Sequence, residues 1–148
     1  MSFNPFNTLT LNLNLPQITE ATLSEAKVSF FTYDGGDDKD KDSRLRITLY
    51  ADFGGGFVLT IAENGGYINY GHFDDHNGGS EHTIDLTVNG TLPISAVNNS
   101  HLKIEFEPNG DDTWKFHYTL SLKFSNGIVL KKEARNKELS DGKRVIDE

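Results

Sequence analysis

Hydrophobic and polar residues alternate along much of this chain. In four segments an apolar side chain occupies every second position: 45–49, 84–88, 102–106 and 114–124. A period of two places the apolar side chains on one face of an extended strand and the polar ones on the other. The pattern therefore predicts a β-strand in each of these four segments.

Weaker alternation predicts further strands at 9–15, 27–33, 57–62 and 67–72. The segment 128–130 is suited to complete a hairpin with 114–124, which brings the total to eight or nine. Asn-Gly, the strongest short hairpin signal, occurs between segments at Asn64, Asn77, Asn89, Asn109 and Asn126. Strands with one apolar face must pack those faces together. We expect an all-β fold, an eight- or nine-stranded antiparallel β-sandwich with acidic loops at one end. A sandwich is preferred to a barrel because the segments differ in length and a long loop, 91–100, interrupts the hairpins.

The chain has 148 residues, which is the length of one domain. We expect residues 1–132 to form this single β-sandwich domain and residues 133–148 to form a flexible, charged tail. In the second range Leu139, Val145 and Ile146 are the only aliphatic residues larger than alanine, and they share no clear period. Chain ends with few apolar contacts stay mobile.

Composition excludes several classes of function. The net charge is −8 and there is no cysteine, so we expect neither a nucleic-acid partner nor a thiolate zinc site or cysteine nucleophile. No serine nucleophile elbow and no phosphate-binding glycine loop occurs, which favours a non-enzymatic protein. The first residues lack the basic and apolar blocks of a secretory signal. A cytoplasmic location is the default expectation, with export by another route left open.

The densest chemical feature is an acidic loop between two predicted strands. Five aspartates fall within nine residues: Asp34, Asp37, Asp38, Asp40 and Asp42. Carboxylates this close repel one another, and calcium, which takes six to eight oxygen ligands, would relieve the repulsion. The alternative interpretation is a solvated turn. An EF-hand is rejected, because the sixth and twelfth positions from Asp38 are Ser43 and Leu49 and the flanks are strands.

Other loops could join this site if the sandwich gathers them at one end. Asp111 and Asp112 are the stronger candidates for additional calcium ligands, and Asp74 with Asp75 the weaker ones. Three aromatic residues are candidates for contact with a ligand: Trp114, Tyr67 and Tyr70. An aromatic ring beside a calcium site can stack on a sugar or enter a membrane interface, although Trp114 also fits the core. Histidines 72, 76 and 82 are suited to zinc, but exposed histidines are the simpler interpretation.

The order of these features resembles the PLAT domain, the β-sandwich of lipoxygenases and lipases. The stretch 28–33 reads VSFFTY and precedes the acidic loop, and 45–50 reads LRITLY. Gly-His-Phe at 71–73 then precedes Ile-Asp-Leu at 84–86, and 104–114 ends in an Asn-Gly-Asp-Asp-Thr-Trp sequence. The resemblance implies a sandwich with a calcium site, although a run of Asp and Lys replaces the family's Gly-Thr-Asp segment. Calcium-dependent membrane-targeting sandwiches of the protein-kinase-C type are the second nearest resemblance.

The main hypothesis is therefore a non-enzymatic calcium-binding module. The bound ion would bridge the protein to a lipid surface or to a protein partner. Two alternatives stay open: a calcium-dependent lectin that binds a glycan, and a small structural or toxin-accessory subunit.

Overall fold

The structure, a computed structural model, describes residues 20–148, so the strand expected at 9–15 lies outside the described residues. The described part forms eight strands and one short 3₁₀ helix: β1 (Leu23–Thr32), β2 (Arg44–Asp52), β3 (Val58–Glu63), β4 (Ser80–Val88), η1 (Ile94–Asn99), β5 (Ser100–Glu107), β6 (Thr113–Phe124), β7 (Val129–Ser140) and β8 (Val145–Asp147). Within this part no helix has the length and apolar character that a membrane span requires.

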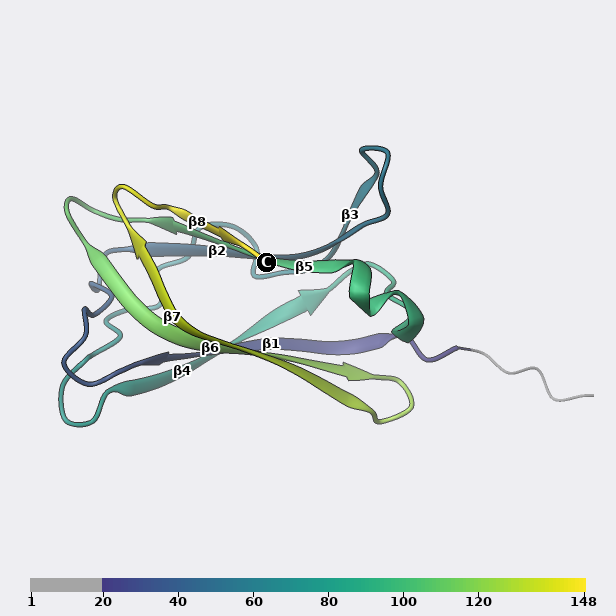
Figure 1. The fold of residues 1–148 in the computed structure, drawn as a ribbon, viewed down its shortest axis with the longest axis horizontal. Helices are drawn as coiled ribbons and strands as arrows, with labels where there is room; N and C mark the ends of the chain where they lie inside the picture. The colour runs from purple at the N-terminus through teal and green to yellow at the C-terminus, as the bar shows by residue number, and fades with distance from the viewer. Residues whose placement is uncertain (1–19) are drawn as a thin grey trace, which may run out of the picture.

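The strands form one antiparallel sheet that folds over on itself (Figure 1). Its order is β7-β6-β1-β4-β3-β2-β5-β8, and it divides into two layers of four strands. The layers join where β3 meets β4, through only two residue pairs, Ala62 with Val88 and Glu63 with Thr87. The all-β prediction is confirmed, and the curvature brings the sheet close to a barrel.

The core lies between the two layers and follows the alternation of the sequence. Nine apolar side chains from the four strictly alternating segments are all in it: Leu45, Ile47, Ile84, Leu86, Ile104, Phe106, Phe116, Leu120 and Leu122. Aromatic rings fill the end nearest the acidic loops, where Trp114 stacks on Phe116 with a centroid distance of 3.9 Å. The Trp114 indole N–H donates a 2.9 Å hydrogen bond to Thr32 Oγ1, which satisfies its one polar group inside the core.

The last sixteen residues differ from the expected flexible tail. Residues 133–140 all belong to β7, which pairs with β6, and β8 pairs with β5. Leu139 and Ile146 are buried in the core. The alternation was hidden because a β-bulge opposite Phe116 and Tyr118 shifts the register of β7 part-way along, and backbone pairing rather than apolar surface holds most of this strand.

The segment 67–72 was also expected to be a strand, and it is not one. It makes a single bridge, between Ile68 and Leu45. Gly65, Gly66 and Gly71 have positive φ angles around it, which interrupts extended pairing. The segment instead forms part of the long β3–β4 loop.

Candidate metal centre

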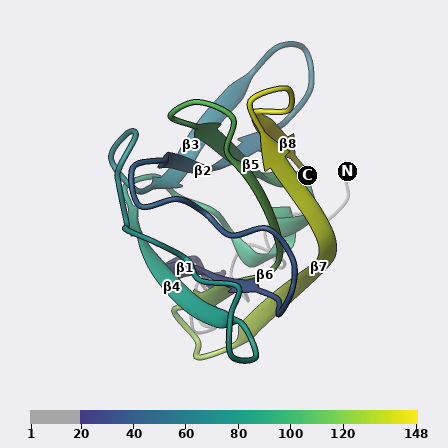
Figure 2. The ribbon, with the colours of Figure 1, turned by 90° about the vertical axis from the view of Figure 1, so that its left-hand side faces the viewer.

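Three loops meet at one end of the sheet, the end that faces the viewer in Figure 2. They are 33–43 between β1 and β2, 64–79 between β3 and β4, and 108–112 between β5 and β6. Lys39 and Phe73 exchange two backbone hydrogen bonds of 3.2 and 3.0 Å, which fasten the first loop to the second. The first loop is also tied to β6, because the Lys115 backbone N–H donates to the Asp37 carbonyl at 2.9 Å.

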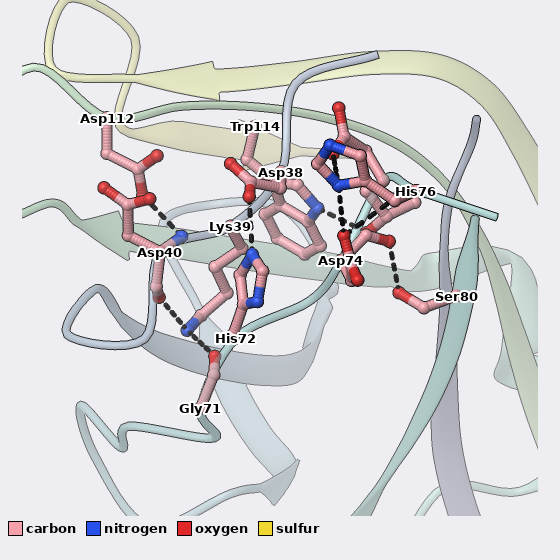
Figure 3. Close-up of polar contacts among 12 residues, drawn as sticks. Asp38, Lys39, Asp40, Gly71, His72, Asp74, His76, Ser80, Asp112 and Trp114 are labelled. Atoms are coloured by element: carbon pink, nitrogen blue, oxygen red, sulfur yellow. Dashed lines mark hydrogen bonds and ion pairs between the residues drawn. The ribbon is translucent and has the colours of Figure 1, made fainter. Parts of the chain in front are cut away.

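This convergence brings three of the predicted calcium ligands together. Asp38, Asp40 and Asp112 each place one carboxylate oxygen within 4.8 Å of the other two (Figure 3). Asp112 is buried and accepts hydrogen bonds from the Asp40 backbone N–H, at 3.1 Å, and from the Ser43 hydroxyl. The group therefore contains oxygen donors from two loops that are adjacent in space and distant in sequence.

The surroundings of Asp40 disfavour its negative charge. Burial raises its pKa above the usual range, and the carboxylates of Asp112, Asp38 and Asp42 raise it further. A divalent cation beside Asp40 would favour the ionised form, since opposite charge stabilises a carboxylate.

Lys39 places a positive charge inside the acidic loop. Its side chain is fully buried, and its ammonium group donates to the carbonyl oxygens of Asp40, at 3.0 Å, and Gly71, at 2.8 Å (Figure 3). The nitrogen also lies 5.0 Å from the centre of the Phe73 ring. Burial lowers the pKa of Lys39 to about 8, against the opposing effect of Asp112, Asp40 and Asp42. The carboxylates therefore repel one another less than their number suggests, and no pattern in the sequence distinguishes this lysine from a solvated one.

The remaining predicted ligands lie apart from this group. Asp37 forms an ion pair with Lys115 at 3.2 Å, and Asp42 accepts a hydrogen bond from the Asn109 side-chain amide at 2.7 Å. Asp34 and Asp111 belong to none of the three-residue clusters within residues 20–148.

Two histidines extend the acidic cluster on its other side. His72 pairs with Asp38, and two further groups with ligand spacing are Asp38–His72–Asp74 and Asp74–Asp75–His76. A hydrogen bond with Asp74 and the charge of Asp75 raise the pKa of His76. Imidazole nitrogen together with carboxylate oxygen is a donor set suited to zinc. His72 and His76 are exposed, as the simpler interpretation held, but both are paired with carboxylates.

The three aromatic residues expected to contact a ligand have different surroundings, and for one of them this expectation is wrong. Trp114 is fully buried, so its ring packs in the core and presents no surface to a ligand. Tyr70 is partly buried and its hydroxyl accepts a 2.8 Å hydrogen bond from the Asn64 side-chain amide. Tyr67, with 38% of its surface exposed, is the candidate that solvent reaches most freely.

Comparison with known proteins adds no relative. Searches against protein-family models, curated proteins and solved structures found no match to this chain. The resemblance to the PLAT domain therefore stays a prediction from the residues that carry it.

Proposed function

We propose that the protein is a calcium-binding β-sandwich module and that the ion is held by Asp38, Asp40 and Asp112. The observation that carries this proposal is the approach of their carboxylate oxygens to within 4.8 Å. The donors in this group are all oxygen, which suits a hard cation, and they lie in loops, which suits the flexible coordination geometry of calcium.

Three carboxylates provide fewer ligands than the six to eight that calcium takes. The free positions would be filled by water or by oxygen atoms of a partner, such as a phosphate or carboxylate group. This is how the ion would connect the module to a lipid surface or a protein. The nearby Lys39 ammonium weakens the binding of a cation, so we expect lower affinity than three carboxylates alone would give.

Calorimetric titration with calcium chloride tests the site. We expect one ion per chain for the wild type and loss of that binding in Asp40→Asn. Asp111→Asn is the matched control, because Asp111 is exposed and lies beside the site without belonging to its clusters. Equal calcium binding by the wild type and Asp40→Asn would contradict the proposal, as would absence of binding by the wild type.

Docking needs a separate test. Flotation with vesicles containing phosphatidylserine, with calcium or with a chelator, shows whether the ion connects the chain to anionic lipid. We expect calcium-dependent flotation of the wild type and Asp111→Asn but not of Asp40→Asn. Wild-type protein that binds calcium but stays off the vesicles would exclude this lipid as the partner.

The histidine side of the cluster supports a second candidate, a zinc ion at Asp38, His72 and Asp74. Titration with zinc chloride distinguishes the two candidates through His72→Gln. That variant removes an imidazole ligand and leaves the oxygen group of Asp38, Asp40 and Asp112 in place. Zinc binding that His72→Gln abolishes would assign a zinc site, whereas unchanged zinc binding would exclude His72 as its ligand.

A further inference from the structure

The outer face of the layer formed by β4, β1, β6 and β7 carries an aromatic cluster. Phe31 of β1 lies opposite Glu81 of β4 on one side and opposite His117 of β6 on the other. Residues directly opposite in antiparallel strands project from the same face of a sheet. Phe30, the preceding residue, is buried in the core, so this face is the one directed to solvent.

His117 is held in one orientation by its neighbours. The Asn136 backbone N–H donates a 2.9 Å hydrogen bond to His117 Nδ1. Asn136 lies at the β-bulge of β7 and has a φ of 57°, a left-handed conformation that asparagine adopts more readily than most residues other than glycine. The ring of Tyr33 stacks on the imidazole at 4.8 Å and that of Phe31 at 6.1 Å.

The hydrogen bond also determines which imidazole nitrogen carries the proton. Nδ1 is the acceptor, so the neutral ring bears its hydrogen on Nε2, which is left as a donor. Burial lowers the pKa of His117, and the positive charge of Arg135 lowers it further, which favours this neutral form.

Two surface grooves adjoin the cluster, and Phe31 and His117 line both of them. The larger, about 310 Å³, is lined also by Thr119, Glu133 and Arg135. The smaller, about 130 Å³, is lined also by Ser29 and Glu81. Within residues 20–148, Glu81, Glu133 and Arg135 take part in no ion pair or side-chain hydrogen bond. Their acceptors and donors are therefore free to meet a ligand.

We propose that this face is a carbohydrate-binding surface, independent of the metal centre. A sugar ring combines apolar C–H faces with hydroxyl groups. The aromatic rings of this surface can pack on the C–H faces. Its carboxylates, guanidinium and imidazole N–H can form hydrogen bonds with the hydroxyl groups. Glu81 and Glu133 disfavour an anionic ligand. Side chains on the outer face of the sheet line both grooves, and the backbone edge of β7 does not, so the grooves offer no backbone ladder to an extended peptide. The larger groove has the size of a small-molecule site, which matches a single sugar ring.

A glycan array probed with the full chain, once in a chelator and once in calcium, tests the proposal. We expect retention of glycans with an accessible neutral sugar, and an affinity about tenfold weaker in Phe31→Ala and in Glu133→Gln. Tyr50→Ala is the matched control, because Tyr50 stacks on His101 at 5.2 Å in the other layer, away from the grooves. Circular dichroism and thermal unfolding of each variant confirm that it folds.

The outcomes separate this proposal from the calcium site. Binding that survives both Phe31→Ala and Glu133→Gln would overturn the proposal, and so would a blank array. Glycan binding that needs calcium and is lost in Asp40→Asn but kept in Phe31→Ala would assign the sugar to the loops and also overturn it. Loss in Phe31→Ala with retention in Asp40→Asn and Tyr50→Ala would support it, whatever the calcium titration shows.

Discussion

At the scale of single residues, a glycine without a side chain allows the β3–β4 loop to lie close to β1. Gly78 and Gly79 both have φ near +90°, where any side chain is strained. They differ in surroundings: a Cβ on Gly79 would lie 2.2 Å from the Thr32 carbonyl oxygen, whereas one on Gly78 would meet nothing within 4 Å. Space for a methyl group therefore exists at one position and not at its neighbour.

This pair gives a test of how tightly the loop is packed. We expect Gly78→Ala to lower the free energy of unfolding by about 1–2 kcal/mol, the cost of the left-handed backbone alone. Gly79→Ala should cost a further 1–3 kcal/mol, because the loop must move away from Thr32. Urea unfolding measures both, and equal losses would show that the loop does not approach β1 as described.

The titration of His117 provides a second test at this scale. Its pKa is lowered in the folded state, so between the ordinary value near 6.5 and the lowered value the unfolded chain binds a proton that the folded chain does not. With respect to His117, the free energy of unfolding should therefore be highest above pH 6.5 and should decline as the pH falls below that value. We expect the wild type to lose more stability between pH 7.5 and 5 than His117→Gln, which cannot titrate. Parallel urea-unfolding results for the two proteins at both pH values would refute this.

At the scale of elements, β7 explains why the sequence pattern predicts a flexible tail at 133–148 where the structure has paired strands. Strands with strict alternation were recognised because one face of each packs against the core. β7 is an edge strand and carries Lys131 and Lys132 there, and lysines on an edge discourage pairing with other chains. A sequence pattern shows which residues are apolar, but it does not show that a largely polar segment pairs through its backbone with a neighbouring strand.

The docking of this chain end is measurable with two aliphatic residues. Leu139 is fully buried on β7, whereas Val145 on β8 has 44% of its surface exposed. Leu139→Ala should lower the free energy of unfolding by about 2–5 kcal/mol, as expected for a cavity in a core. Val145→Ala should change it by less than about 1 kcal/mol. Similar small effects of both substitutions in thermal or urea unfolding would restore the interpretation of a flexible tail.

At the scale of the whole molecule, the sequence indicated the fold class and the core but only part of the candidate site. Alternation and Asn-Gly turns depend on local geometry, so strands and hairpins can be predicted directly from the sequence. Which loops converge depends on the order of strands in the sheet, and this determined that Asp112 joins Asp38 and Asp40 while Asp34 and Asp111 do not. The buried Lys39 arises from the same convergence, because its carbonyl partner Gly71 lies in another loop.

Thermal unfolding in calcium and in a chelator tests the proposal that Asp38, Asp40 and Asp112 bind calcium. An ion bound only by the folded chain, at a concentration a hundredfold above its dissociation constant, stabilises it by about 2.7 kcal/mol. For a domain of this size the Tm should rise by roughly 5–10 °C over a chelator control. Magnesium should raise the Tm less than calcium does, because it requires octahedral geometry and loses water reluctantly. Asp40→Asn should abolish the calcium-specific rise, and Asp111→Asn should retain it. Equal melting curves in calcium and in sodium at matched ionic strength would reduce the effect to charge screening and contradict the claim.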